Sequence, residues 1–360
     1  MKQITLVFLT LCYYATAQPP SGYYSSASGL SGYALKSQLA NIIAAGQNTR
    51  GYGELLDLYF ISDNDVYYDA NQSDTVLDLY SENPLGPDPY NYTRNDNCGN
   101  FNREGVCYNR EHIFPQGFFN QQTTPRNDAH HVIPTDGWVN GGRSSFPFGE
   151  VDLANPASIT VYSNGSRRGA SATPGFTSTV FEPIDEFKGD IARMLLYFAT
   201  RYENNHNDSS WDNPNSSIND PRDGSKGRFY EQWYVDLLVQ WHVQDGVSQR
   251  EIDRNNDIFN YQNNRNPFID NPQFVEMIWT TTAGSADQIL SQLSIAPNPS
   301  PGRFYINTSA PVDTVVIYSL SGRIVASYSN TESFYLNKSG IYLAKVTVEG
   351  QSKTYKLVVR

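Results

Sequence analysis

The most informative part of this 360-residue chain runs through three short segments: YNREHIFP at residues 108–115, DAHHVIPTD at 128–136 and VNGGR at 139–143. Three of the five histidines of the chain lie in these segments. The surrounding residues, 101–150, alternate short apolar pieces with turn residues. We therefore expect short secondary-structure elements here, joined by turns.

These segments hold a carboxylate, an imidazole and a carboxamide, in Glu111, His112 and Asn140. Hydrolysis of a phosphodiester bond with a single metal ion needs these three groups. Mg²⁺ prefers oxygen ligands and keeps several waters, so the Glu111 and Asn140 oxygens could bind it and leave room for a phosphate oxygen. A neutral imidazole, titrating near neutrality, can accept the proton of the attacking water, and the cation stabilises the charge that builds up on the phosphate.

Ordinary structural roles could also explain these residues. A Glu-His pair is common in proteins, the pair His130-His131 could hold a buried turn, and Asn140 precedes two glycines, as turn residues often do. A zinc site is a further alternative. However, the chain has no H-E-x-x-H motif, and its two neighbouring histidines are adjacent rather than four residues apart.

Helical spacing of apolar residues predicts helices elsewhere in the chain. The predicted helices cover residues 35–45, 184–202, 230–243 and 273–279. Residues 18–34, rich in Gly, Ser and Tyr, are predicted to form an extended arm. Residues 82–100 and 203–228 are rich in turn-forming residues, which predicts two long loops, the second of them flexible.

The sequence pattern changes towards the C-terminus, where short alternating runs are separated by turn residues. The predicted strands are residues 303–307, 314–318, 323–326, 341–346 and 354–359. This pattern is typical of a small antiparallel β-sandwich, here over 294–360. The predicted fold class is therefore α+β, with a mixed domain over 18–285 and a separate all-β domain after it.

The N-terminus has the features of a secretory signal peptide. Lys2 precedes an apolar run over residues 4–14, and Ala15-Thr16-Ala17 forms a cleavage signal. The apolar run is too short to span a bilayer, and we expect no transmembrane segment elsewhere. The sequence therefore predicts a secreted protein whose residues 1–17 are removed.

Two cysteines remain after this cleavage, Cys98 and Cys107. An even cysteine count in an exported protein favours a disulfide bond. Two free thiols are the alternative. A zinc site is disfavoured, because this pair lacks further ligands at matching spacing.

The charge distribution argues against binding nucleic acid through a broad basic face. The formal net charge is −11, although residues 291–360 carry seven Lys or Arg and three Asp or Glu, so the acidic excess lies before them. A nucleic-acid enzyme of this charge must rely on a local site and a bound cation.

Several motifs, taken in order, resemble the bacterial endonuclease I family, whose members are extracellular or periplasmic nucleases with a His-Me finger (ββα-metal) site. The motifs are NREH at 109–112, DAHHVIPTD at 128–136, YYSSASGLSG at 23–32, FEPIDEFKGDIAR at 181–193 and NRNPFID at 264–270. The likeness covers nearly all of residues 20–280. Two departures, Gly117 in place of Ser and Ser145 in place of Asn, involve neither the proposed ligands nor the base.

The resemblance implies a role for each site residue. Glu111 and Asn140 would bind the metal, and His112 would be the general base. The ββα unit would place Glu111 and His112 on a hairpin and Asn140 on the following helix. The family also has an arginine near the scissile phosphate. Here it would be Arg126 or Arg143, and the resemblance does not choose between them. His130 would orient the site through hydrogen bonds.

The resemblance also implies the cofactor and the substrates. The cofactor is Mg²⁺, with Ca²⁺ or Mn²⁺ as alternatives. The substrates are DNA and RNA, cut with little sequence specificity by a monomer. The motifs at 188–190 and 264–267 are expected to hold helices around the site rather than to take part in the reaction.

The tail has its own resemblance. IAPNP at 295–299, VIYSLSGR at 316–323, GIY at 340–342 and KLVV at 356–359 resemble the C-terminal sorting domain of type IX secretion substrates. This implies export across the outer membrane by the type IX machinery, to the cell surface or the medium. A carbohydrate-binding sandwich is the alternative for the tail.

Three functions stay open for the whole chain. The first is an endonuclease of low specificity. The second is a non-catalytic DNA-binding or adhesion protein with the same fold, which the presence of Glu111, His112 and Asn140 disfavours. The third is a metallohydrolase for another phosphodiester, since an acidic surface also suits small substrates.

Overall fold

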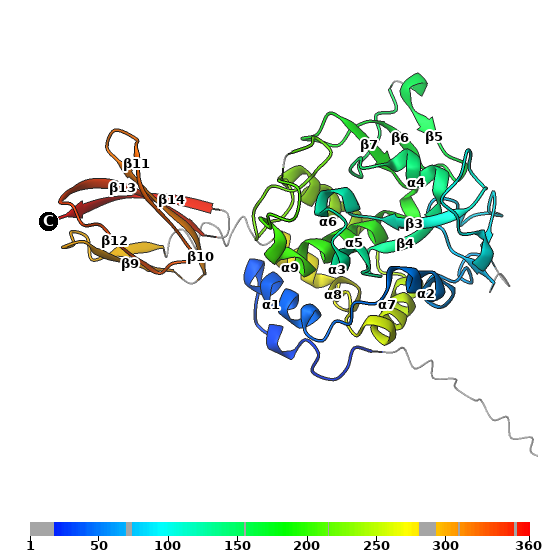
Figure 1. Cartoon of the computed structure of the whole chain (residues 1–360), viewed down its shortest axis with the longest axis horizontal. Coiled ribbons are helices and arrows are strands. Elements are labelled where there is room, and N and C mark those ends of the chain that lie inside the picture. Colours follow the sequence, from blue (N-terminus) through cyan, green and yellow to red (C-terminus); the bar gives the residue numbers. More distant parts are fainter. Residues whose placement is uncertain are drawn as a thin grey trace, which may run out of the picture.

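The computed structural model describes residues 18–69, 74–154, 156–214, 216–280, 293–308, 310–348 and 351–360. The predicted signal peptide, 1–17, and the predicted domain end at residue 285 lie outside these ranges. The described helices include none that is long and apolar enough to cross a membrane. Helices and strands are mixed before residue 281, and the described residues after 292 form strands alone, as the sequence predicts (Figure 1).

A hairpin followed directly by a helix forms the centre of the first part. Strands β3 (Tyr108–His112) and β4 (Val132–Asp136) pair antiparallel, with Glu111 opposite Ile133. Helix α4 (Gly137–Arg143) begins where β4 ends. The Asp136 carboxylate caps this helix by accepting a hydrogen bond from the Val139 amide at 2.8 Å. Because α4 begins beside Cys107, at the start of β3, it runs along that strand and places Asn140 next to Asn109.

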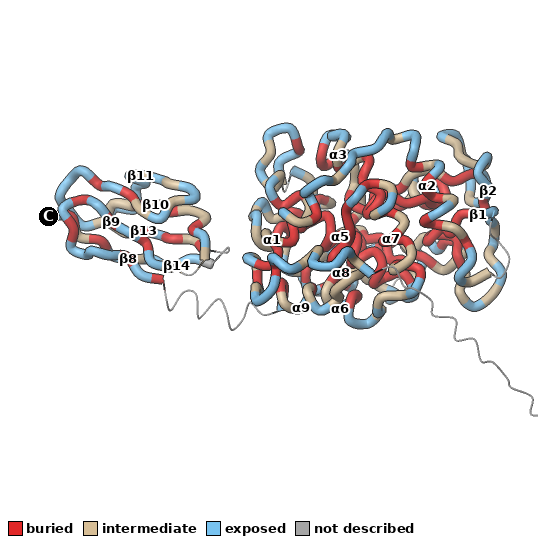
Figure 2. The backbone as a smooth tube through the Cα atoms, turned by 90° about the horizontal axis from the view of Figure 1, so that it is seen from below, coloured by how far each residue is buried: buried red, intermediate tan, exposed pale blue. Residues whose placement is uncertain are grey.

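Helix α5 (Lys188–Arg201) is buried along almost its whole length, as the red tube in Figure 2 shows. It packs against α6 (Gln232–Gln244) and α1 (Gly32–Ala44), and α1 and α6 also pack against α9 (Gln273–Trp279). These four helices confirm the four predicted ones, although α5 begins at residue 188 rather than 184. Short helices α3 (Thr123–Arg126) and α8 (Pro267–Asp270) complete this region.

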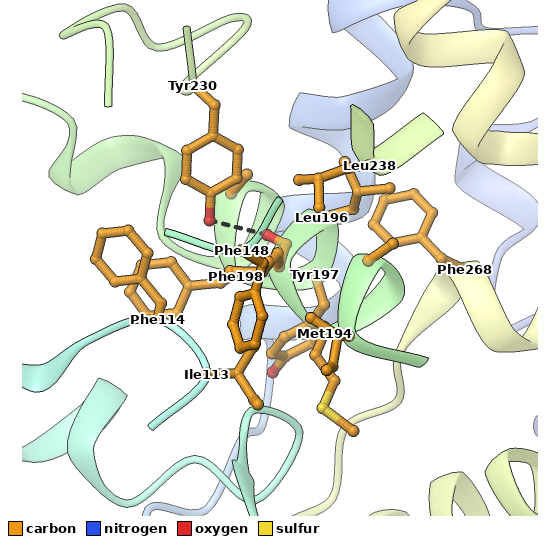
Figure 3. Close-up of a cluster of buried hydrophobic side chains, with 14 of the residues drawn as sticks. Ile113, Phe114, Phe148, Met194, Leu196, Tyr197, Phe198, Tyr230, Leu238 and Phe268 are labelled. Carbon is orange, nitrogen blue, oxygen red and sulfur yellow. Dashed lines mark hydrogen bonds between the residues drawn. The ribbon is translucent and has the colours of Figure 1, made fainter. Parts of the chain in front are cut away.

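The hairpin is tied to the helices by the apolar residues that follow His112. The rings of Phe114 and Phe198 stack with their centroids 4.2 Å apart. Figure 3 shows them beside Ile113 and below Tyr230, whose hydroxyl donates a hydrogen bond to the Leu195 carbonyl at 3.1 Å. Burial of these side chains removes much apolar surface from water, which stabilises the position of β3 against α5.

Besides the short α3 and α8, two longer helices were not predicted, α2 (Leu55–Ser62) and α7 (Gln249–Gln262). Helix α7 is rich in charged and amide side chains, several of which are buried, so its sequence lacks an apolar stripe. It begins with a capping box, in which Ser248 and Glu251 satisfy each other's backbone amides. This signal was present in the sequence.

Two small antiparallel sheets complete the first part. One pairs β1 (Thr75–Val76) with β2 (Tyr92–Thr93). The other joins β5 (Thr160–Val161), β6 (Arg167–Ala170) and β7 (Thr179–Glu182) in that order.

Two loop predictions need correction. The arm at 18–34 is not extended, because it contains a 3-10 helix at Ser25–Ala27 and the start of α1. The described residues of the loop at 203–228 are irregular apart from a 3-10 helix at Glu203–Asn205. They are anchored rather than loose, because the Asp212 amide donates a hydrogen bond to the Phe118 carbonyl at 3.1 Å and the Trp211 ring packs against that of Phe119.

The C-terminal part is a two-sheet sandwich, as predicted. One sheet has the order β11 (Ile324–Ser329), β10 (Val312–Ser319), β13 (Gly340–Val348), β14 (Gln351–Val359), and the other β12 (Ser333–Tyr335), β9 (Arg303–Asn307), β8 (Ser294–Ala296). Strands β8 and β12 were not predicted. Alternate residues such as Phe304, Val315 and Ile317 form its core.

Candidate active site

A cleft of about 580 Å³ opens beside the β3–β4–α4 unit. Glu111 and His112 reach it from the end of β3, and Asn140 reaches it from α4. Gln116 and Gly117 line it from the turn after β3, and Ser145 from the segment after α4. The structure thus brings together the three side chains singled out in the sequence.

Glu111 is buried, at 2% exposure, between two hydrogen-bonding groups. Its Oε1 atom accepts a hydrogen bond from the Tyr80 hydroxyl at 2.9 Å and pairs with Nη1 of Arg143 at 3.2 Å. Its Oε2 atom takes part in neither contact. Burial raises the pKa of Glu111 to about 6, and the Arg143 charge and the Tyr80 hydrogen bond oppose this rise.

His112 is held in one tautomer by the backbone. Its Nε2 atom lies 3.1 Å from the carbonyl oxygen of Arg126. A carbonyl can only accept a hydrogen bond, so Nε2 carries the proton and Nδ1 keeps the lone pair. Burial, followed by the proximity of His131, lowers the pKa of His112 to about 3. The imidazole is therefore neutral at physiological pH. The sequence led us to expect a histidine that titrates near neutrality, and this expectation is wrong for the buried side chain.

Asn140 is oriented by a second amide. Its Nδ2 atom donates a hydrogen bond to Oδ1 of Asn109 on β3, at 2.7 Å. This bond uses a donor of Asn140, so its Oδ1 atom remains available as an oxygen ligand. Sequence reasoning missed Asn109, although it stands directly in the NREH motif.

Arg126 and Arg110 both contact one aromatic ring, that of Tyr52. Their guanidinium carbons lie 4.0 and 3.9 Å from the ring centroid of Tyr52. Arg126 is half-buried, and its Nε atom has no hydrogen-bond partner among the described residues. The Tyr52 ring also stacks on the His112 imidazole, with the centroids 6.0 Å apart. Arg126 is therefore a cation close to the imidazole, held by cation–π contact.

Arg143 lines the cleft beside Glu111, whereas Arg126 is not among the lining residues, but Arg143 is only 1% exposed. Its Nη1 atom donates to the His112 carbonyl at 3.0 Å, and its Nη2 atom donates to the Ile113 carbonyl at 2.6 Å. Both terminal nitrogens are thus engaged with the backbone of β3 and the turn that follows. The side chain holds Glu111 and this backbone together.

His130 lies away from the cleft, in a buried polar network. Its Nε2 atom is 3.1 Å from the Asn264 carbonyl, and its amide donates to Asp128. The neighbouring His131 is closer to the site, with its ring centroid 6.0 Å from that of His112. His131 also contacts the Pro125 carbonyl at 2.7 Å, which fixes the turn that carries Arg126.

The predicted disulfide is present at the edge of the cleft. Cys98 and Cys107 are bonded, and Cys98 lines the cleft. The Cys107 carbonyl accepts a hydrogen bond from Gly137, the first residue of α4, at 2.9 Å. The disulfide therefore braces both the start of β3 and the start of the helix that carries Asn140.

Residues 31–273 match the endonuclease I family along a stretch that contains the whole cleft. The chain belongs to the endonuclease I family. An extracellular ribonuclease of Bacillus amyloliquefaciens is 32% identical over 260 residues, which are 71% of this chain and 78% of the relative. An extracellular ribonuclease of Bacillus subtilis (strain 168) is 34% identical over 262 residues, with the same shares of each chain.

Residues 294–360 match the secretion system C-terminal sorting domain. As a member of the endonuclease I family with a type IX sorting domain, the protein is a nuclease that is secreted or held at the cell surface. Family membership also indicates dependence on a divalent metal. The oxygen atoms of Glu111 and Asn140, facing one cleft, fit the preference of hard divalent cations for oxygen ligands.

Proposed function

We propose that this member of the endonuclease I family hydrolyses phosphodiester bonds of both DNA and RNA, with little sequence specificity. The observation that carries the proposal is the fixed tautomer of His112, whose unprotonated Nδ1 belongs to a buried, neutral imidazole in the cleft that Glu111 and Asn140 also line. Such an imidazole is a base at physiological pH.

The local fold supports a His-Me finger unit. Two antiparallel strands and a helix follow one another in the order β3, β4, α4, with the candidate base on the first strand and the candidate ligand Asn140 on the helix. All of these residues come from one chain, which is consistent with activity as a monomer.

Glu111 and Asn140 are the proposed ligands of a divalent cation, Mg²⁺ in the first place and Ca²⁺ or Mn²⁺ as alternatives. When bound, the cation supplies stabilisation of the negative charge on the phosphate and the leaving oxygen. Arg143 and Tyr80 orient the Glu111 carboxylate through Oε1. Asn109 turns the amide of Asn140 so that its oxygen is free to bind.

His112 is the proposed general base. Its Nδ1 atom accepts the proton of the attacking water, and the Nε2 hydrogen bond to the Arg126 carbonyl stabilises the imidazolium that forms. Burial keeps this residue neutral in the resting enzyme, and therefore ready to accept a proton.

Arg126 is the proposed phosphate-binding arginine, in preference to Arg143. The terminal nitrogens of Arg143 are taken up by two backbone carbonyls, whereas Arg126 is half-buried and contacts an aromatic face. His130 is proposed to support the site indirectly, through Asp128 and the Asn264 carbonyl.

The same contacts support activity on both nucleic acids. The proposed cation, base and arginine all address the phosphodiester group, which DNA and RNA share, so they do not discriminate between the two. Arg110 and Arg126 offer local positive charge in a protein of net charge −11. We also propose that residues 1–17 are a cleaved signal peptide, and that the nuclease domain covers 18–285, before the sorting domain at 294–360.

The decisive experiment measures plasmid nicking and RNA cleavage, with Mg²⁺ affinity, for three variants. Glu111→Ala and Asn140→Ala should weaken Mg²⁺ binding, and excess Mg²⁺ should restore part of the rate. His112→Ala should bind Mg²⁺ normally and lose about 10²–10⁴ in rate, the usual contribution of a general base, without rescue by metal. His206→Ala, a histidine outside the cleft, is the matched control.

Near-normal cleavage by His112→Ala would overturn the proposed base. Unchanged Mg²⁺ affinity in Glu111→Ala would move the metal elsewhere. Binding of DNA without cleavage in excess Mg²⁺ would favour a non-catalytic protein, and cleavage of a small diester alone would favour another metallohydrolase.

A further inference from the structure

Four acidic side chains meet outside the active-site cleft, around the loops that flank β1. One oxygen atom from each of Asp65, Asp69 and Asp88 lies within 4.8 Å of the others. Glu82 faces the same three carboxylates and interacts with each of them. None of the four lines the cleft that holds Glu111 and His112.

Glu82 is a buried carboxylate to which no group in the described part of the chain donates a hydrogen bond. Its exposure is 1%, and neither of its carboxylate oxygens has a partner among the described residues. Asp65 is also 1% exposed, and its Oδ1 atom likewise has no hydrogen-bond partner among the described residues. A buried carboxylate that lacks both hydrogen bonds and a positive charge is strongly disfavoured.

Other buried carboxylates in this part of the protein have a positive partner or accept several hydrogen bonds, as Asp78, Asp128 and Asp136 do. Arg193 pairs with Glu251, Arg250 with Asp190, Arg254 with Asp63 and Arg265 with Asp270. No such pair is found for Glu82 or Asp65 among the described residues. Burial and mutual repulsion instead raise the pKa of Asp65 to about 7 and that of Glu82 to about 9. The missing component of the cluster is therefore a positive charge.

We propose that Asp65, Asp69, Glu82 and Asp88 form a cation site that is separate from the proposed catalytic site, and that its ligand is Ca²⁺. All four side chains offer only oxygen atoms as ligands, and soft metal ions prefer sulfur or nitrogen ligands. The cluster therefore favours a hard cation. Ca²⁺ accepts six to eight oxygens in a flexible geometry, whereas Mg²⁺ demands a near-ideal octahedron and is usually bound through one or two carboxylates. A cluster of four loop carboxylates fits Ca²⁺ better.

The site lies on the chain segment that supports Glu111. Two residues before Glu82, the Tyr80 hydroxyl donates to Glu111 at 2.9 Å, and Asp78 accepts a hydrogen bond from the Asp136 amide at 2.7 Å. A cation held by Glu82 on one side and Asp65 on the other ties this segment to the end of α2. Its role is to stabilise the fold, so the proposal does not depend on the proposed reaction.

The test measures thermal unfolding of the full chain, followed by tryptophan fluorescence, in EDTA and in Ca²⁺, together with Ca²⁺ binding by calorimetry. Wild type should rise in Tm by roughly 5–10 °C at a Ca²⁺ concentration 100-fold above Kd. Glu82→Gln should lose this rise and one bound Ca²⁺. Asp74→Asn removes the same charge from an exposed position in the same loop, and it should keep both.

Asn140→Ala removes a proposed ligand of the catalytic metal and should keep the Ca²⁺-dependent rise in Tm. This result separates the two sites even if the proposed function fails. The same rise in Glu82→Gln as in wild type, no rise in wild type, or an equal rise with Mg²⁺ would overturn the proposal. Should Glu82→Gln not fold, the half-buried Asp88→Asn tests the same loss of Ca²⁺ binding.

Discussion

The nuclease part and the C-terminal sandwich are stabilised in different ways. Among the described residues after 292, Ser300 is the only buried polar residue, and the core of the sandwich is built from alternating apolar side chains. The nuclease part instead buries many charged residues, including the ion pair of Arg193 with Glu251, which joins α5 to α7. Hydrophobic periodicity is thus sufficient to predict one part and insufficient for the other.

Helix α7 illustrates the difference. Arg250, Glu251, Arg254 and Asn255 are all buried on this helix, and each has a specific polar partner elsewhere in the fold. From the sequence pattern alone, polar residues such as these are predicted to be exposed to solvent. Only the partners make their burial favourable, and those partners are distant in the sequence.

The largest effect should come from breaking a buried charge pair. Arg193→Ala removes two hydrogen bonds to Glu251, of 2.5 and 2.8 Å, and leaves that carboxylate buried without its charge partner. The nuclease part should lose about 3–5 kcal/mol of unfolding free energy. Urea unfolding followed by tryptophan fluorescence measures this part alone. The five tryptophans are Trp138, Trp211, Trp233, Trp241 and Trp279.

The double variant Arg193→Met with Glu251→Met is the control, because it removes both charges and keeps much of the buried volume. It should lose less stability than Arg193→Ala. A double variant as unstable as the single one would show that packing, rather than charge pairing, dominates here.

The sandwich should respond to the loss of an apolar side chain. Ile317 is fully buried in β10, so Ile317→Ala should destabilise the sandwich by roughly 2–4 kcal/mol. Hydrogen exchange in peptides from 312–348, measured by mass spectrometry, should accelerate. Ile324→Ala, the same substitution at a position that is 59% exposed, should have little effect. A shift of the tryptophan transition by Ile317→Ala would show that the two parts unfold together.

The pH dependence should show which buried group limits the enzyme. Glu111, with a pKa of about 6, must lose its proton to bind a cation, so protons compete with metal as the pH falls below this value. The apparent Mg²⁺ affinity should fall about tenfold per pH unit there, as expected for release of one proton on binding. His112, with a pKa of about 3, should remain a base at pH 5.

Cleavage rates measured from pH 5 to 8 over a full Mg²⁺ titration would separate these two groups. Saturating Mg²⁺ should restore most of the rate at pH 5. A rate at saturating Mg²⁺ that still declines around pH 6.5, the usual pKa of histidine, would contradict the assignment of a buried, neutral His112.

The smallest effect is expected from removing the sandwich. Truncation after Ser285 should leave kcat/KM for plasmid DNA unchanged, because the proposed metal ligands, base and phosphate-binding arginine all lie within 111–143. The truncated chain should, however, fail to reach the medium in the native host. A large loss of activity with an unchanged tryptophan transition would place part of the site, or the domain boundary, elsewhere.

The sequence by itself determined five of the sandwich strands, four of the larger helices, the disulfide and the residue types of the candidate site, because these depend on local periodicity, on cysteine count and on short motifs. The tertiary structure alone decided the tautomer of His112, set by the Arg126 carbonyl, and the partner that orients Asn140. It also showed that both terminal nitrogens of Arg143 donate to backbone carbonyls, which is the observation behind our proposal of Arg126. The physical reason is that the availability of a guanidinium depends on the groups packed around it, and those of Arg143 include the carbonyls of His112 and Ile113.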